Sequence, residues 1–138
     1  MTGGTTPDTP LPRIGDILNY IFLFDAETKY RDEGVKERPC MVYSVSAETR
    51  LVKVLPLTTK GERYVGTIAL PQDVAQKANL HYPTAVVVTE GNVFTWLGFD
   101  LRPLISSGNN LIGRMPPGFT AKIMAAAKNA KEIDRDNG

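Results

Sequence analysis

The sequence predicts one mainly β domain, a small closed barrel with one short inserted helix and one helix near its C-terminal end. Short runs of β-branched and aromatic residues recur between Gly, Pro and charged segments, which is typical of several short antiparallel strands. Apolar residues recur at helical spacing in two segments. The 138 residues, 42% of them hydrophobic, are enough to bury one core. Closing the strands into a barrel and packing a helix across it would bury the apolar faces of both.

Each expected strand is an apolar or alternating run that lies between turn signals. The strands are expected at residues 17–24, 40–45, 51–55, 67–70, 84–89 and 93–97. A turn at 47–49 joins the second strand to the third as a hairpin, and Pro56 is expected to end the third. Gly91-Asn92 is expected to form a turn or bend before the last strand.

The two helices are marked by prolines at their first turns. Pro71 precedes a short helix at 72–79, and Pro116-Pro117-Gly118 opens a terminal helix. The apolar positions of that terminal helix are Phe119, Ile123, Ala126, Ala127 and Ala130. The domain is therefore expected at residues 13–131, after a Thr/Pro/Gly-rich leader at 1–12 and before a polar tail at 132–138 that should fray.

Composition narrows the class of protein and the kind of site. No apolar run reaches the roughly 18 residues that a membrane span needs, and the N-terminus has no features of a secretion signal. A single cysteine allows no internal disulfide, which suits the cytoplasm, and with a single histidine it cannot build a His/Cys metal site. No dinucleotide or phosphate-loop motif predicts a cofactor. Because the net charge is only +1, a nucleic-acid site would have to be a local patch.

Two charged segments are the candidates for such a patch. Residues 25–38 contain 9 Asp, Glu, Lys or Arg among 14 residues and are expected to form a long solvated loop, and residues 60–66 form a second one. Long loops in compact domains are often functional. Arg38 ends the first loop, and Thr58 follows the third strand. If the second and third strands form a hairpin, these two residues are neighbours at one rim of the barrel.

The pair of Arg38 and Thr58 is suited to phosphate chemistry. A guanidinium can hold a phosphate through two parallel hydrogen bonds and stabilise the charge that develops when a phosphodiester is attacked. A Thr hydroxyl or amide can hold another phosphate oxygen, and Glu33 can take a proton from a ribose 2′-hydroxyl. The alternative is structural: the arginine would pair with a nearby carboxylate such as Asp32 or Glu37, and the threonine would be a turn residue.

Two other reactive residue types are assigned to structural roles. His81, the only histidine, is expected to be a surface or cap residue near the end of the first helix. Cys40 begins a strand and is expected to be a small buried apolar residue, because a thiol nucleophile usually needs a histidine partner.

The order of several short motifs is similar to the signature of the PemK/MazF family of toxins from toxin–antitoxin pairs. These motifs are Gly15-Asp16-Ile17 at the start of a strand, a long loop, residues 36–42 (Lys-Glu-Arg-Pro-Cys-Met-Val) and residues 54–59 (Val-Leu-Pro-Leu-Thr-Thr). Each motif alone is weak, and their combination covers residues 15–60. The segment 89–103 resembles a divergent branch of the same family.

The resemblance implies an SH3-like barrel of the PemK/MazF/CcdB type that forms a homodimer. It implies a metal-independent endoribonuclease that needs no cofactor, cleaves single-stranded RNA and leaves a cyclic phosphate. It also implies a cognate antitoxin whose tail blocks the RNA groove. Position by position, the catalytic residues fall on Arg38, Thr58 and Glu33. The usual Gly-Ser-Glu-Gln of the loop is replaced here by Arg-Asp-Glu-Gly.

Residues around this pair are candidates for RNA binding. The basic side chains are Lys36, Lys60 and Arg63, and the others are Thr59 and Tyr64. Bases of single-stranded RNA stack on aromatic rings, for which Tyr30 and Trp96 are further candidates. A solvated charged surface and, for Trp96, a place in the core or at a dimer contact are the alternatives.

Two other functions fit the same fold. A CcdB-like inhibitor would bind DNA gyrase and cut nothing, although the polar C-terminal end has no obvious anchor for that contact. An inactive family member would bind RNA or a protein partner without cleavage, because the fold alone does not define the site.

Overall fold

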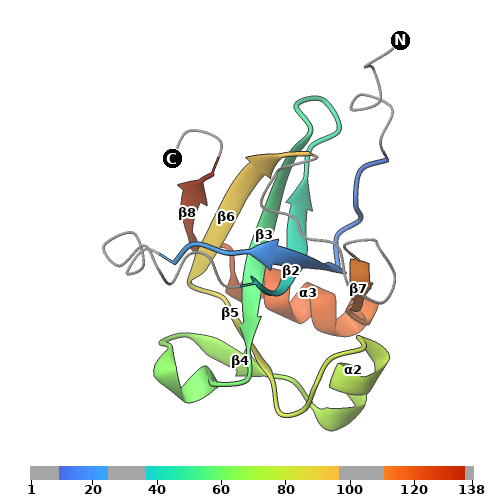
Figure 1. The fold of residues 1–138 in the computed structure, drawn as a ribbon, viewed down its shortest axis with the longest axis vertical. Coiled ribbons are helices and arrows are strands. Elements are labelled where there is room, and N and C mark those ends of the chain that lie inside the picture. The colour runs from blue at the N-terminus through green and yellow to red at the C-terminus, as the bar shows by residue number, and fades with distance from the viewer. Residues whose placement is uncertain (1–9, 25–36, 97–110, 136–138) are drawn as a thin grey trace.

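The computed structural model of the chain describes residues 10–24, 37–96 and 111–135. In chain order its elements (Figure 1) are β1 (Asp16–Ile21), β2 (Glu37–Val45), β3 (Leu51–Thr58), the 3₁₀ turn η3 (Gly61–Arg63), β4 (Thr67–Ala69), α2 (Gln72–Lys77), β5 (Ala85–Val87), β6 (Glu90–Thr95), β7 (Leu111–Arg114), α3 (Pro117–Ala126) and β8 (Lys131–Asp134). Within these ranges, neither helix is long and apolar enough to cross a membrane.

In the described residues the strands form one eight-stranded sheet with the order β4-β5-β3-β2-β1-β7; β6 also pairs with β3, and β8 pairs with β6. The mainly β class with a short inserted helix and a C-terminal helix is confirmed. The expected closure into a barrel is not found, because the pairing of the described strands leaves β4 and β7 as open ends. Six of the seven pairings between the described strands are antiparallel, as expected, whereas β6 and β8 run parallel.

The hairpin of β2 and β3 is the centre of the sheet. Cys40 pairs with Pro56 and Met41 pairs with Leu55, so the two strands are antiparallel as expected. Side chains alternate between the two faces of a strand, and both faces are buried here. Met41 and Leu55 enter one core cluster while Cys40 and Val54 enter the other. Burial on both faces explains why these strands read as nearly continuous apolar runs.

The prediction that Pro56 ends the third strand is wrong. β3 continues to Thr58, and its outer partner changes from β6 at residues 51–54 to β5 at residues 57–58. Proline has no N–H to donate. Because Pro56 lies between the ladders with β6 and β5, no hydrogen bond to either strand is lost at this position. The extension carries Thr58 to the end of the sheet.

Arg38 belongs to a strand and not to the charged loop in which it was expected. β2 begins at Glu37, and its first residues pair with β1, Tyr20 opposite Arg38 and Asn19 opposite Pro39. The pairing of β2 with β3 starts only at Cys40, so Pro39 lies just outside that ladder. Arg38 is therefore held by a regular backbone.

Gly91 and Asn92 also lie within a strand, β6, where a turn was expected. A side chain at Gly91 would come within 2.4 Å of the Tyr43 hydroxyl, so this position needs glycine for close packing and not for a turn. Asn92 is fully buried and exchanges two hydrogen bonds with the backbone of Leu23, at 2.8 and 2.9 Å. A buried amide satisfied in this way fits a strand interior.

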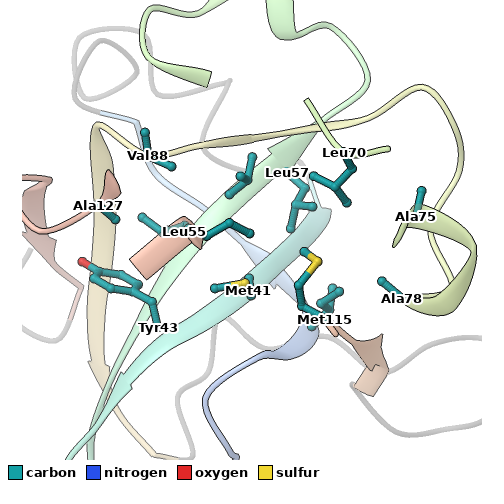
Figure 2. Close-up of a cluster of buried hydrophobic side chains, with 13 residues drawn as sticks. Met41, Tyr43, Leu55, Leu57, Leu70, Ala75, Ala78, Val88, Met115 and Ala127 are labelled. Carbon is teal, nitrogen blue, oxygen red and sulfur yellow. The ribbon is translucent and has the colours of Figure 1, made fainter. Parts of the chain in front are cut away.

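The two faces of the sheet carry two core clusters. One is mainly aromatic and includes Tyr20, Phe22, Phe94 and Trp96. Trp96 is 6% exposed, which agrees with a place in the core. Figure 2 shows the other cluster, in which Met41 and Leu55 from the central hairpin face side chains from the helices, such as Ala75 of α2 and Ala127 just after α3. Of the apolar positions expected for the terminal helix, Ile123 and Ala127 are buried, Phe119 and Ala130 are half-buried, and Ala126 is exposed.

The polar tail expected to fray instead contributes the strand β8 over Lys131–Asp134. Glu132 accepts hydrogen bonds from the Tyr43 hydroxyl at 3.1 Å and from Lys53 Nζ at 2.9 Å. The backbone ladder pairs this strand with β6, and the two polar contacts connect it to β2 and β3. β7 was not predicted either, because four residues are too few to show a period. The expected leader at 1–12 is described only from residue 10, and Leu11 packs against the aromatic cluster.

The turn after α2 packs closely on β7 and forms one wall of the cavity described below. A Cβ atom added to Gly113 would lie 2.2 Å from the Ala78 carbonyl oxygen. The neighbouring Asn79 donates a 2.9 Å hydrogen bond from its Nδ2 atom to the Ile112 carbonyl. Close approach of two backbones therefore sets the position of this turn.

We expect Gly113→Ala to lower the free energy of unfolding by about 1–3 kcal/mol, because the added methyl group forces two backbones apart. Gly118→Ala is the matched control, since a Cβ there meets nothing within 4 Å and the residue lies in helix α3. The control should be neutral or slightly stabilising. Urea unfolding of both variants measures the difference. Equal stability of the two variants would show that the close approach is not present.

Candidate active site

A cavity of about 500 Å³ lies at the end of the sheet where β2 begins and β3 finishes. Figure 1 shows α2 and the segment that follows β3 at this same end. The lining residues come from these strands, from the segment that contains η3, from the α2–β5 connection and from β7: Arg38, Pro39, Leu57, Thr58, Thr59, Lys60, Arg63, Tyr64, Asn79, Leu80, His81, Thr84 and Ile112.

The structure brings Arg38 and Thr58 to one rim, as the hairpin predicts. Each lies two residues beyond the Cys40–Pro56 pair, so continuing that antiparallel register places them opposite each other. Arg38 is also paired with β1 and Thr58 with β5, which holds both backbones from their outer sides. Both side chains are half-buried and line the same cavity.

The guanidinium of Arg38 is oriented by two aromatic side chains. Its Cζ atom lies 4.9 Å from the centroid of the Phe24 ring, and its Nη1 atom donates to the Tyr64 hydroxyl at 3.4 Å. The rings of Phe24 and Tyr64 stack on each other with centroids 4.9 Å apart and planes 23° apart. Arg38, Phe24 and Tyr64 therefore form one packed group, and Tyr64 already uses one face of its ring.

Thr58 is placed by backbone contacts on both sides. Its Oγ1 atom accepts a 2.9 Å hydrogen bond from the Lys60 amide, and its carbonyl accepts a 3.3 Å bond from the Thr84 hydroxyl. A hydroxyl oxygen that accepts such a bond keeps its own proton as a donor. The turn from Thr58 to Lys60 therefore fixes a hydroxyl donor at the edge of the cavity.

The lining of the cavity is cationic although the chain is nearly neutral. Arg38, Lys60 and Arg63 line it together with His81, and its lining residues include neither Asp nor Glu. Lys60 and Arg63 are exposed. Apolar side chains, among them Leu57 and Leu80, provide the rest of the surface. Such a site favours an anion that also carries an apolar or aromatic part.

The wall formed by the α2–β5 connection was largely missed from the sequence. His81 was expected to be a surface or cap residue, and it is exposed but also lines the cavity. Asn79 lines it too, in a left-handed conformation with φ of 63°. Asn tolerates that conformation and is common just after a helix, which is the signal that could have indicated this turn.

Several predicted site residues cannot be placed in this cavity. Glu33 and Lys36, as well as Tyr30, lie outside the described residues. Of the others, Thr59, Lys60, Arg63 and Tyr64 all line the cavity. In the described parts of the chain, His, Cys, Asp and Glu side chains form no group of three or more that could hold a metal ion.

The comparisons with known proteins bear on the fold. No protein-family model matches the chain, and a search of curated proteins finds no match. Among solved structures, the chain is similar to one in the crystal structure of MazE–MazF (Form-II) from Deinococcus radiodurans, with a TM-score of 0.54 and 16% sequence identity. The similarity covers 86% of this chain and 93% of that one. The chain thus has a MazF-like fold.

Cys40 lies two residues after Arg38 in β2 and is fully buried, so it is unsuited to nucleophilic catalysis. Burial raises the pKa of the Cys40 thiol, and the nearby Arg38 charge offsets only part of this effect. The thiol therefore stays protonated at neutral pH, when a nucleophile would have to be a thiolate. The expectation of a small buried apolar residue is confirmed.

We expect a thiol reagent such as DTNB to leave Cys40 unmodified in the native protein at about pH 8, near the ordinary thiol pKa. The same reagent should react fully once the chain is unfolded in guanidinium chloride, which serves as the control. Absorbance of the released product measures both rates. Native-state modification as fast as that of the unfolded chain would contradict the burial described above.

Proposed function

We propose that this protein is the toxin of a toxin–antitoxin pair and acts as an endoribonuclease on single-stranded RNA. The observation that supports the proposal most strongly is the shared cavity of Arg38 and Thr58, at the rim where the hairpin ends. The MazF-like fold agrees with this proposal.

The proposed reaction uses the 2′-hydroxyl of the RNA itself. Its oxygen attacks the adjacent phosphorus, the 2′-O–P bond forms, and the P–O5′ bond breaks to leave a 2′,3′-cyclic phosphate. The departing O5′ takes up a proton from water and becomes a 5′-hydroxyl. Arg38 stabilises the charge that develops on the phosphoryl oxygens, and the Thr58 hydroxyl donates to one of them. Glu33 is proposed as the base that takes the 2′-hydroxyl proton, on the sequence alone. This mechanism requires no metal ion.

The cavity offers separate surfaces for the phosphate and the base of a nucleotide. Lys60 and Arg63 are exposed cations that can bind neighbouring phosphates, and Thr59 lies beside them. Pro39, Leu80 and Ile112 provide an apolar surface for a base. Tyr64 is a further RNA contact, and Lys36 is proposed as one from the sequence alone.

We further propose an antitoxin partner and a homodimer. The similar structure is described as a complex of MazE with MazF, and the fold similarity covers most of both chains. A partner segment that carries carboxylates would suit the cationic cavity, because it would occupy the place of the RNA phosphates.

We expect the wild-type protein to cleave single-stranded RNA in the presence of EDTA, and Arg38→Ala to lower kcat by about 100-fold or more through loss of transition-state stabilisation. Lys77→Ala is the matched control, since Lys77 is an exposed cation of α2 that does not line the cavity. Gel analysis of a labelled oligoribonucleotide measures both. Equal cleavage by Arg38→Ala and wild type would exclude this active site, whereas RNA binding without cleavage would indicate an inactive family member.

We expect Thr58→Val to lower cleavage by about tenfold or more, because a phosphoryl oxygen loses its donor. Thr58→Ser keeps the hydroxyl and its hydrogen bond with the Lys60 amide, so it should retain most of the activity. Comparison of the two initial rates, with circular dichroism to check folding, isolates the hydroxyl. If both substitutions have the same effect, the Thr58 hydroxyl does not act in the reaction.

A further inference from the structure

The guanidinium of Arg38 is constrained in two independent ways. Its Cζ atom lies over the Phe24 ring, 4.9 Å from the ring centroid, where cation–π attraction acts on the group. The Tyr64 hydroxyl accepts a hydrogen bond from Nη1 at 3.4 Å. The ring contact and the hydrogen bond act on different atoms of the group, and together they limit its movement.

Phe24 is itself a fixed surface. Its side chain is 2% exposed and meets Phe22 edge-on, with centroids 4.9 Å apart and planes 60° apart. The preceding residue, Leu23, exchanges two backbone hydrogen bonds with the fully buried side chain of Asn92. Phe24 is therefore fixed within the aromatic core cluster, where its ring contacts Arg38.

Tyr64 is held on the other side of the group. Its ring stacks on Phe24, and its amide donates to the Gly61 carbonyl at 3.1 Å. The next residue, Val65, accepts a 3.2 Å hydrogen bond from the Thr89 hydroxyl through its carbonyl. The stack brings together two residues forty positions apart in sequence, and each touches the guanidinium.

We propose that Phe24 and Tyr64 are positioning residues that hold the Arg38 guanidinium in its working orientation before RNA binds. This inference rests on the proposed cleavage function. An arginine side chain that is free in the unbound protein loses rotamer entropy when it binds the transition state, whereas a side chain held in place has already lost it. The benefit appears in kcat, because it applies to the group that stabilises the transition state.

The role of Tyr64 as a positioning residue can be separated from its role as a surface for an RNA base. A base stacks on the ring, which Tyr64→Phe keeps, whereas the contact with Arg38 uses the hydroxyl, which Tyr64→Phe removes. We expect Tyr64→Phe to lower kcat by about five- to tenfold, with KM changed by less than about twofold. Its thermal midpoint should equal that of wild type, since the stack on Phe24 remains.

Tyr82→Phe is the matched control for loss of a hydroxyl, because Tyr82 is 55% exposed and does not line the cavity. Phe24→Leu should lower kcat further by removing the ring. Its control is Phe119→Leu, since Phe119 carries the other aromatic–cation contact of the described residues, 5.5 Å from Lys122 Nζ. Both controls should keep the kcat of wild type.

A second measurement on the full chain without RNA does not depend on cleavage. Nitrogen-15 NMR of the Arg38 guanidinium reports rotation about its Nε–Cζ bond, which should be slow in wild type and in Tyr82→Phe but faster in Tyr64→Phe. If wild type cuts no RNA, the proposed function fails, and this rotation alone decides whether the two aromatic residues hold Arg38. Unchanged rotation in Tyr64→Phe, or a change in KM with kcat intact, would overturn the proposal.

Discussion

The register of the β2–β3 hairpin determines both the core of this fold and its candidate site. The pairs Cys40–Pro56 and Met41–Leu55 determine which side chains enter each core cluster. A shift by one residue would exchange the two faces of the shifted strand. It would also separate Arg38 from Thr58, because these residues lie opposite each other only in this register. The same register therefore specifies the core and the candidate site.

The elements around this hairpin contribute the other walls of the cavity. The change of partner along β3 near Pro56 lets β5 reach Thr58, and the Thr84 hydroxyl then bonds to the Thr58 carbonyl. The turn after α2 is held against β7 by the close approach at Gly113, which places Asn79 and His81 on the facing wall. Lys60 and Arg63, from the segment after β3, complete the cavity. Positive charge is therefore concentrated at the cavity, although the net charge of the chain is only +1.

The sequence was sufficient where one local pattern determined the structure. The central hairpin and α3 followed from alternation and helical spacing, and the meeting of Arg38 with Thr58 followed from the hairpin. It was insufficient where distant contacts decide: Gly91 and Asn92 are typical turn residues, but Tyr43 and the Leu23 backbone hold them in a strand. The polar strand β8 and the contact of Arg38 with Phe24 and Tyr64 likewise depend on residues far apart in the chain. No local pattern encodes such contacts.

In the proposed function, the cavity at the rim of the hairpin binds the RNA phosphate that is cleaved. The most direct measurement is a crystal structure of the full chain with an oligoribonucleotide that carries a 2′-O-methyl group at the cleavage position, which blocks the attacking oxygen. We expect one phosphate within about 3 Å of both the Arg38 guanidinium and the Thr58 hydroxyl. An oligonucleotide bound on another face of the protein, with this cavity left unused, would contradict it.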